Sequence, residues 1–260
     1  MHDLPQTAHL VSPTADADRH EPQATTYSIV IPAYNEAENL APLYAEIIAA
    51  MQDVDGDFEI IFVDDGSTDY TASVLARLSA ADPAVRFVQL AANGGKTAAL
   101  HAGFTASRGK WIIMMDADRQ NDPRDIPRLV EASGDADLVC GRRTRRRDTW
   151  RKRISSRFAN SIRRAVLGDT LRDVNCGFKM FRRRCLTRVR LYHGMHRFLP
   201  LLFAMEGYRV VEVDVNDRPR VAGQSKYGIF NRLIGPFVDM LAVRWMRSAR
   251  LNYHIKRQGD

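Results

Sequence analysis

The sequence predicts an α/β protein in which a central, mostly parallel sheet is flanked by helices. Short apolar runs alternate with helical patterns from residue 27 to residue 141, as in repeated strand–helix–strand units. The runs are continuous, as at 111–115, and this is typical of strands that are covered on both faces. Polar clusters follow several of the runs, which places them together at one edge of such a sheet.

The expected elements follow one another in a regular order. A strand over 27–31 is stopped by Pro32, and Asn35 is the expected N-cap of a helix over 36–51. Further strands are expected at 58–63, 85–90, 111–115 and 137–140, separated by helices that follow residue 69, run from about 96 to 107 and span 123–133. Beyond residue 141 the pattern predicts a helix at 155–167, a strand reaching 181, a helix at 196–205, a strand at 209–213 and an amphipathic helix at 229–250. The chain is thereby divided into a leader over 1–26, one domain over 27–228 and a helical extension over 229–260.

Composition indicates a globular protein with anionic partners. Of the 260 residues, 45% are hydrophobic and 27% charged, and the net charge is +7. Such a charge favours nucleotide phosphates, nucleic acid or an anionic membrane. The cysteines Cys140, Cys176 and Cys185 lack metal-binding spacing and indicate a reducing compartment, and Cys140 lies in an apolar run typical of a core.

No segment of the sequence has the pattern of a membrane span or a secretion signal. An apolar run of 18 residues is absent, and residues 1–26 are polar without an apolar centre. We therefore expect a disordered leader and a cytoplasmic protein.

The first candidate site is the alternation of Asp116, Asp118 and Gln120 directly after a predicted strand. In an extended or turning backbone these side chains can converge on one cation. Oxygen ligands of this kind suit Mg²⁺ or Mn²⁺, and Mg²⁺ commonly shares its ligands with substrate phosphates. The alternative is a plain polar turn in which Asp122 and Pro123 begin the next helix.

Other strand ends carry candidates for nucleotide binding. Asp65 can accept a hydrogen bond from a nucleobase or a ribose hydroxyl, whereas Asp69 fits a helix cap. Tyr34 can stack on a base and Glu36 can accept from the ribose, although packing and a first-turn helix charge explain them equally well. Lys96 follows two glycines near the nucleotide, but the segment lacks the first glycine of a P-loop.

Three basic segments come later. Arg220 and Lys226 lie in a polar loop that can close over a pyrophosphate, unless it is only a solvated loop. Residues 142–153 hold eight basic residues in twelve, in which Arg143 is the best candidate for a phosphate contact. This run has too few aromatic residues for a nucleic-acid site, so an anionic lipid surface, the acceptor phosphate or plain solvation remain. The last helix resembles an interfacial helix, and docking onto the domain or a partner is the alternative.

Together these segments resemble glycosyltransferase family 2, in the branch of dolichyl-phosphate mannose synthase and polyprenyl-phosphate glycosyltransferases. The matching segments are IPAYNEAENL at 31–40, VDDGSTD at 63–69, NGGKTAAL at 93–100, MDADRQNDP at 115–123, GRR at 141–143, DVNCGFKMFRR at 173–183 and RVAGQSKYG at 220–228. The resemblance implies a GT-A (Rossmann-like) fold. It implies that the nucleoside contacts are Pro32, Tyr34, Glu36, Val63 and Asp65, that the metal and diphosphate contacts are Asp116, Ala117, Asp118 and Gln120, and that the phosphate contacts are Arg143, Arg220 and Lys226. Among these, catalytic roles fall to Asp118, Arg220 and Lys226.

Three positions depart from the family pattern. Arg119 stands where this branch usually has an apolar residue, and no C-terminal membrane helix is evident. Membrane contact would then be peripheral or through a partner. Arg244 and Trp245 match the end of the Q-x-x-R-W motif of processive enzymes, but Leu241 replaces its glutamine, which excludes polymer synthesis.

The resulting hypothesis is an inverting, Mg²⁺- or Mn²⁺-dependent transfer of a hexose from a UDP- or GDP-sugar to a polyprenyl phosphate such as undecaprenyl phosphate. It places the enzyme in cell envelope biosynthesis at the cytoplasmic face of the inner membrane. A phosphate monoester has a second pKa near ~6, so it needs no strong base. Transfer to a saccharide or lipid hydroxyl is the alternative and would need a base, for which Asp173 is a weak candidate. A non-catalytic module that binds anionic surfaces through 142–153 is a further alternative.

Overall fold

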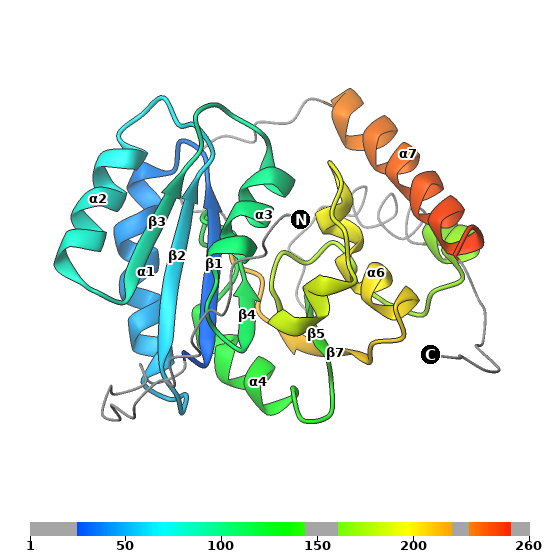
Figure 1. Ribbon diagram of the computed structural model, residues 1–260, viewed down its shortest axis with the longest axis horizontal. Coiled ribbons are helices and arrows are strands. Elements are labelled where there is room, and N and C mark those ends of the chain that lie inside the picture. Colours follow the sequence, from blue (N-terminus) through cyan, green and yellow to red (C-terminus); the bar gives the residue numbers. More distant parts are fainter. Residues whose placement is uncertain (1–24, 144–160, 220–228, 251–260) are drawn as a thin grey trace, which may run out of the picture.

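The computed structural model of the chain describes residues 25–143, 161–219 and 229–250 (Figure 1). Of residues 229–234 and 236, only the backbone is described. Residues 1–24 of the leader expected over 1–26, most of the basic run and the 220–228 loop lie outside the described residues.

The described strands form one sheet in the order β3-β2-β1-β4-β6-β5-β7. Their bounds are Tyr27–Ala33 (β1), Phe58–Asp64 (β2), Val85–Gln89 (β3), Trp111–Met114 (β4), Leu138–Arg143 (β5), Lys179–Arg182 (β6) and Val210–Val215 (β7). Strand β6 runs antiparallel to both of its neighbours, β4 and β5, and the other neighbouring pairs are parallel. The prediction of a mostly parallel sheet is confirmed, with β6 as the exception.

Helices cover both faces of the sheet (Figure 1). Their bounds are Ala37–Met51 (α1), Thr71–Ala81 (α2), Lys96–Ala106 (α3), Ile126–Glu131 (α4), Leu199–Met205 (α6) and Ile229–Ser248 (α7), and residues 161–167 are also helical. Short 3₁₀ helices span Pro123–Asp125 (η1), Arg183–Thr187 (η2) and Met195–Phe198 (η3). Most of these elements begin and end within a few residues of the sequence prediction.

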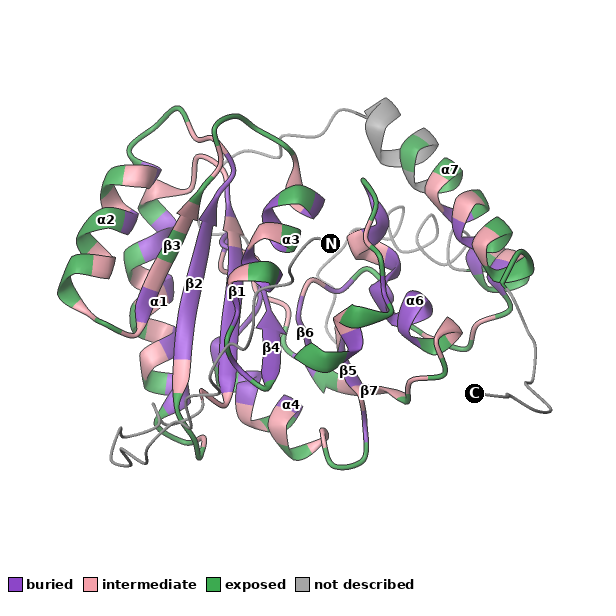
Figure 2. Cartoon of the chain, viewed as in Figure 1, coloured by how far each residue is buried: buried purple, intermediate pink, exposed green. Residues whose placement is uncertain are grey.

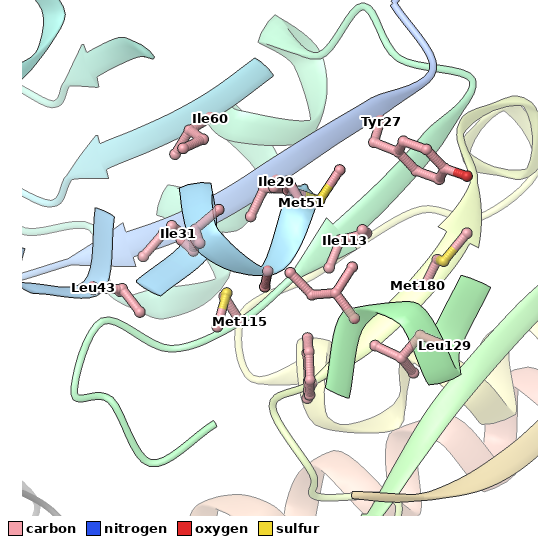
Figure 3. Close-up of a cluster of buried hydrophobic side chains, with 14 of the residues drawn as sticks. Tyr27, Ile29, Ile31, Leu43, Met51, Ile60, Ile113, Met115, Leu129 and Met180 are labelled. Atoms are coloured by element: carbon pink, nitrogen blue, oxygen red, sulfur yellow. The ribbon is translucent and has the colours of Figure 1, made fainter. Parts of the chain in front are cut away.

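The central strands β1, β2 and β4 are largely apolar because each separates two cores. Ile29 and Ile31 of β1 join the core beneath α1, α2 and α4, whereas Val30 joins the core beneath α3, α6 and α7. Figure 2 shows the central strands buried between helices whose outer faces are exposed. Figure 3 shows the first core, in which Ile113 and Met180 of adjacent strands lie near Leu129 of α4. Cys140 is buried in the second core, as predicted.

Two local predictions at the end of β1 are wrong. Strand β1 does not stop at Pro32, which pairs with Val63 of β2. In a parallel strand, the backbone groups of one residue bond to the strand on one side, and those of the next residue bond to the strand on the other side. The Val30 carbonyl accepts from the Met115 N–H, so the nitrogen of Pro32, two residues later, also faces the β4 side, where β4 has already ended. No ladder hydrogen bond is lost there, which is why proline is tolerated.

Asn35 is not the N-cap of α1, a position that Glu36 occupies. Asn35 instead has a φ of 53° and accepts from the backbone N–H of Thr68 at 2.8 Å. Asparagine adopts this left-handed conformation more readily than most residues. It therefore joins the turn after β1 to the turn after β2. Asp69 is likewise not the N-cap of α2, a position that Tyr70 occupies, although its Oδ1 accepts from the N–H of Thr71 at 2.9 Å at the start of that helix.

Candidate active site

The candidate residues converge at one edge of the sheet. Strands β1, β2 and β4 are parallel, with Ala33 opposite Asp64 and Val30 opposite Met114. Strand β5 is antiparallel to β6, which is itself antiparallel to β4, so β5 points in the same direction. The segments after these four strands therefore share the carboxyl edge, where open α/β sheets bind ligands.

Asp116 lies between a lysine and a glycine. The Lys96 ammonium, at the start of α3, is 2.5 Å from its Oδ1, and a Cβ added to Gly177 would lie 2.6 Å from its Oδ2. Burial raises the pKa of Asp116, but the ammonium outweighs this effect and the net pKa is lowered. Asp116 is thus an ionised carboxylate, and the absence of a Cβ at Gly177 leaves space beside its Oδ2.

The turn after Asp116 is held by its own polar groups. Asn121 Oδ1 accepts from the Asp116 backbone N–H at 3.0 Å, and Asp118 Oδ1 accepts from the Gln120 N–H at 3.1 Å. Asp118 is buried, with 7% of its surface exposed. Asp116, Asp118 and Gln120 therefore belong to one short, internally bonded turn.

The donor set of this turn fits a divalent cation that also binds a diphosphate. Two carboxylates and one amide oxygen are hard ligands, and Mg²⁺ typically binds one or two carboxylates and completes its shell with water and phosphate oxygens. Among the described residues there is no group of three His, Cys, Asp or Glu that could hold a metal by itself. The turn thus suits a cation that is shared with a substrate, and the room beside Asp116 is consistent with this role.

On the β2 side, Asp65 is fixed by a neighbouring turn. Its Oδ1 accepts from the Gly94 N–H at 2.8 Å, and burial raises its pKa. The preceding Asp64 is fully buried, and its Oδ2 has no hydrogen-bond partner among the described residues. Glu36 accepts from the Asn39 amide at 2.6 Å, so it also supports the first turn of α1.

Some residues implied by the resemblance could contact a nucleotide only through the main chain. The Val63 side chain is fully buried in the core beneath α3, where a Cβ on Gly103 would be 3.0 Å from it. The Ala117 side chain is buried in the opposite core. Pro32 is paired within the sheet, one residue before the strand ends.

Arg143 makes a bidentate ion pair with Asp173. Its Nε lies 2.8 Å from Oδ2 and its Nη2 lies 2.9 Å from Oδ1. Burial lowers the pKa of Arg143, but the carboxylate outweighs this effect and raises it. Asp173 is thus engaged as a counter-ion, a poor state for a general base.

His196 is a site residue that the sequence analysis missed. Its Nδ1 lies 2.7 Å from the Thr97 hydroxyl, which also accepts from the Gly194 N–H at 3.0 Å. Burial, aided by the nearby cations Lys96 and Arg197, lowers its pKa to about 2, so the ring is neutral. The sequence predicted a helix there, but no spacing connected this histidine to Thr97, which lies 99 positions earlier.

Two expected site residues cannot be placed. Arg220 and Lys226 lie outside the described residues, as does the basic run from residue 144 to residue 153. The two residues that begin the predicted 142–153 run, Arg142 and Arg143, are described, and Arg142 Nε lies 2.5 Å from Asp214 Oδ1.

Comparison with known proteins gives consistent relatives. The profile described as glycosyl transferase family 2 matches residues 28–190. The dodecaprenyl-phosphate galacturonate synthase of Rhizobium johnstonii is 38% identical over 228 residues, which cover 85% of this chain and 67% of the relative. An undecaprenyl-phosphate 4-deoxy-4-formamido-L-arabinose transferase of Edwardsiella ictaluri is 36% identical over 217 residues, which cover 82% of this chain and 66% of the relative. The chain spans about two thirds of the length of both.

Solved structures share the fold. Glucosyl-3-phosphoglycerate synthase from Mycobacterium tuberculosis, in a complex with Mn²⁺, UDP-glucose and phosphoglyceric acid, matches with a TM-score of 0.64 at 22% identity. The match covers 88% of this chain and 81% of that one, and the shared architecture is the GT-A fold. Because the family profile matches more than half of the sequence, the chain belongs to glycosyl transferase family 2 and is a glycosyltransferase.

Proposed function

We propose that this glycosyltransferase catalyses inverting, metal-dependent transfer of a hexose from a UDP- or GDP-sugar to a polyprenyl phosphate such as undecaprenyl phosphate. The two relatives are named for sugar transfer to dodecaprenyl and undecaprenyl phosphate. The observation that carries the proposal is the bidentate pairing of Asp173 with Arg143. Because the Asp173 carboxylate is engaged with a cation, it is poorly suited to act as a general base. A polyprenyl phosphate is an acceptor that reacts without a general base, whereas a hydroxyl acceptor would need one.

In this proposal the residues of the carboxyl edge divide the work. Asp65, Tyr34 and Glu36 hold the nucleoside, and the main chain of Pro32, Val63 and Ala117 borders it. Asp116, Asp118 and Gln120 hold Mg²⁺ or Mn²⁺, which when bound supplies Lewis-acid stabilisation to the departing nucleoside diphosphate.

Cationic side chains complete the site. Arg143, Arg220 and Lys226 bring positive charge to the donor and acceptor phosphates, where preorganised charge lowers the barrier to leaving-group departure. Lys96, beside Asp116, adds a fourth cation to this edge.

We propose that α7 lies on the surface of a bilayer and that the polyprenyl phosphate enters the site from this bilayer. Phe237, Val238, Leu241 and Trp245 are 51%, 56%, 46% and 69% exposed. At 100° per residue they share a stripe about 100° wide. Met240 and Val243 face the protein and are buried, and Arg244 borders the exposed stripe.

An apolar stripe next to arginine fits an anionic lipid surface, here the cytoplasmic face of the inner membrane. Within the described residues, no helix is long and apolar enough to span a bilayer. Flotation with vesicles of anionic or zwitterionic lipid tests the contact. The double substitution Leu241→Ala with Trp245→Ala should reduce binding to anionic vesicles, whereas Tyr70→Ala, at the exposed aromatic residue that precedes α2, should not. Equal binding of both variants would contradict this surface.

The reaction is tested by transfer from a panel of radiolabelled UDP- and GDP-sugars, with and without Mn²⁺. Undecaprenyl phosphate and undecaprenol serve as matched acceptors that differ only in the phosphate. We expect an organic-extractable product from undecaprenyl phosphate alone. Equal transfer to undecaprenol, with a pH-dependent loss in Asp173→Asn, would favour a hydroxyl acceptor instead.

A further inference from the structure

Glu46, in the third turn of α1, joins two arginines from distant parts of the chain. Its Oε1 is paired with Arg119 Nη2, and its Oε2 lies 2.6 Å from Arg218 Nη1. All three side chains are about three-quarters buried, with 25%, 21% and 24% of their surfaces exposed. The second guanidinium nitrogen of Arg218 is paired with Asp122. The Glu46 carboxylate thus connects α1 to two segments: the proposed metal-binding turn, which contains Asp116, Asp118 and Gln120, and the segment after β7.

Arg119 adopts an unusual backbone conformation in making this contact. Its φ is 60°, in the left-handed region that residues other than glycine, asparagine and aspartate rarely adopt. Through its guanidinium, Arg119 contacts α1 from the middle of the metal-binding turn. This contact explains why a cation stands between Asp118 and Gln120.

The segment after β7 is bonded directly to the same turn. The Arg218 N–H donates to the Gln120 carbonyl at 2.9 Å, and Asn121 forms a β-bridge with Asp217. Two further bonds join Asn216 to Asp125, at 2.6 Å and 3.0 Å. Residues 216–218 and residues 118–125 are therefore one hydrogen-bonded unit, which Glu46 connects to α1.

We propose that Glu46 is a positioning residue for sugar transfer, which sets the metal-binding turn relative to the nucleoside side of the site. Helix α1 begins beside Glu36, so the carboxylate relates the donor-binding strand end to the turn that holds the cation. The proposal rests on the proposed function for its substrate, but it also predicts the affinity for Mn²⁺ and UDP.

The substitution Glu46→Gln keeps the shape of the side chain and removes the charge that both arginines share. We expect at least tenfold weaker binding of UDP in the presence of Mn²⁺ and at least tenfold lower kcat, because small misplacements of substrate-holding groups are costly. Calorimetric titration measures the first and radiolabelled transfer the second. Glu131→Gln, at an exposed residue that ends α4, is the matched control and should behave as the wild type.

Arg119→Gly separates positioning from stability. Glycine accepts the left-handed backbone, so this variant should unfold at a temperature close to that of the wild type while it lacks the contact to Glu46. It should weaken UDP binding as Glu46→Gln does, and the double variant should be no worse than either single variant.

The outcomes are distinct. Wild-type UDP binding and kcat in both variants would overturn the proposal, as would a lower unfolding temperature of Glu46→Gln with unchanged binding. If the wild type transfers no sugar to undecaprenyl phosphate, the proposed function fails, while the Mn²⁺ and UDP titrations still decide the role of Glu46.

Discussion

The space beside Asp116 depends on the absence of a side chain at Gly177. A Cβ at this position would lie 2.6 Å from Oδ2, 2.9 Å from Cγ and 3.0 Å from Oδ1. Ordinary contact begins near 3.4 Å, so Gly177→Ala must displace the carboxylate by about 0.8 Å. Distances in metal sites hold to about ±0.2 Å, so this displacement should remove Asp116 from the cation.

We expect Gly177→Ala to lower kcat by about a hundredfold and to weaken Mn²⁺ binding, measured by calorimetry in the presence of UDP. The fold should not suffer, because the φ of Gly177 lies outside the left-handed region, and such a substitution can stabilise a protein by about 0.4–1 kcal/mol. Gly134→Ala is the matched control, since no atom of the described part of the chain lies within 4 Å of its added Cβ. Normal Mn²⁺ affinity and turnover in Gly177→Ala would refute the assignment of Asp116 as a ligand.

Three further predictions concern the same edge of the sheet. Asp118→Asn should abolish transfer without a change in circular dichroism or unfolding midpoint, and near-normal turnover with Mg²⁺ or Mn²⁺ would remove it from the metal site. His196→Asn should make the stability of the fold less dependent on pH. Folding lowers the pKa of His196 from 6.5 to about 2, so below pH 6.5 the unfolded wild type binds a proton that the folded wild type does not, and the folded state of the wild type is destabilised. Urea unfolding should show that the wild type loses about 1.4 kcal/mol more than the variant between about pH 7.5 and 5.5, and parallel curves would contradict a buried neutral ring. Lys96→Met should tighten Mn²⁺ binding without nucleotide by up to about fivefold, because a part-exposed ion pair with Asp116 contributes up to about 1 kcal/mol, and unchanged titrations would show that the ammonium does not compete.

Local pattern was sufficient to predict the elements and their carboxyl-edge residues. Continuous apolar runs such as 111–115 identify buried strands, because only a strand covered on both faces can do without polar positions. Since parallel strands end at a common edge, the segments containing Asp65, Asp116 and Arg143 could be assigned to one region without coordinates. The same logic does not determine the direction of β6, because a strand of only four residues is compatible with either pairing.

Contacts between side chains that are far apart in the sequence could not be predicted from local sequence patterns. Nothing in the spacing of Glu46, Arg119 and Arg218 indicates that they meet, because 172 positions separate the first from the last. For the same reason Asn35 was expected to cap its own helix, although it bonds to Thr68 across the sheet edge. Asp173 could be considered a base only until its bidentate pairing with Arg143 was seen.

The sequence by itself determined the family, the order of strands and helices and the carboxylates that are candidates for the cation, because each depends on residues that are close in the chain. Only the tertiary structure decided which carboxylates are engaged by arginines, that His196 is neutral beside Thr97 and that Gly177 makes room for Asp116. These properties arise from burial and from contacts between distant segments, which set the charge and the position of a side chain after the chain has folded.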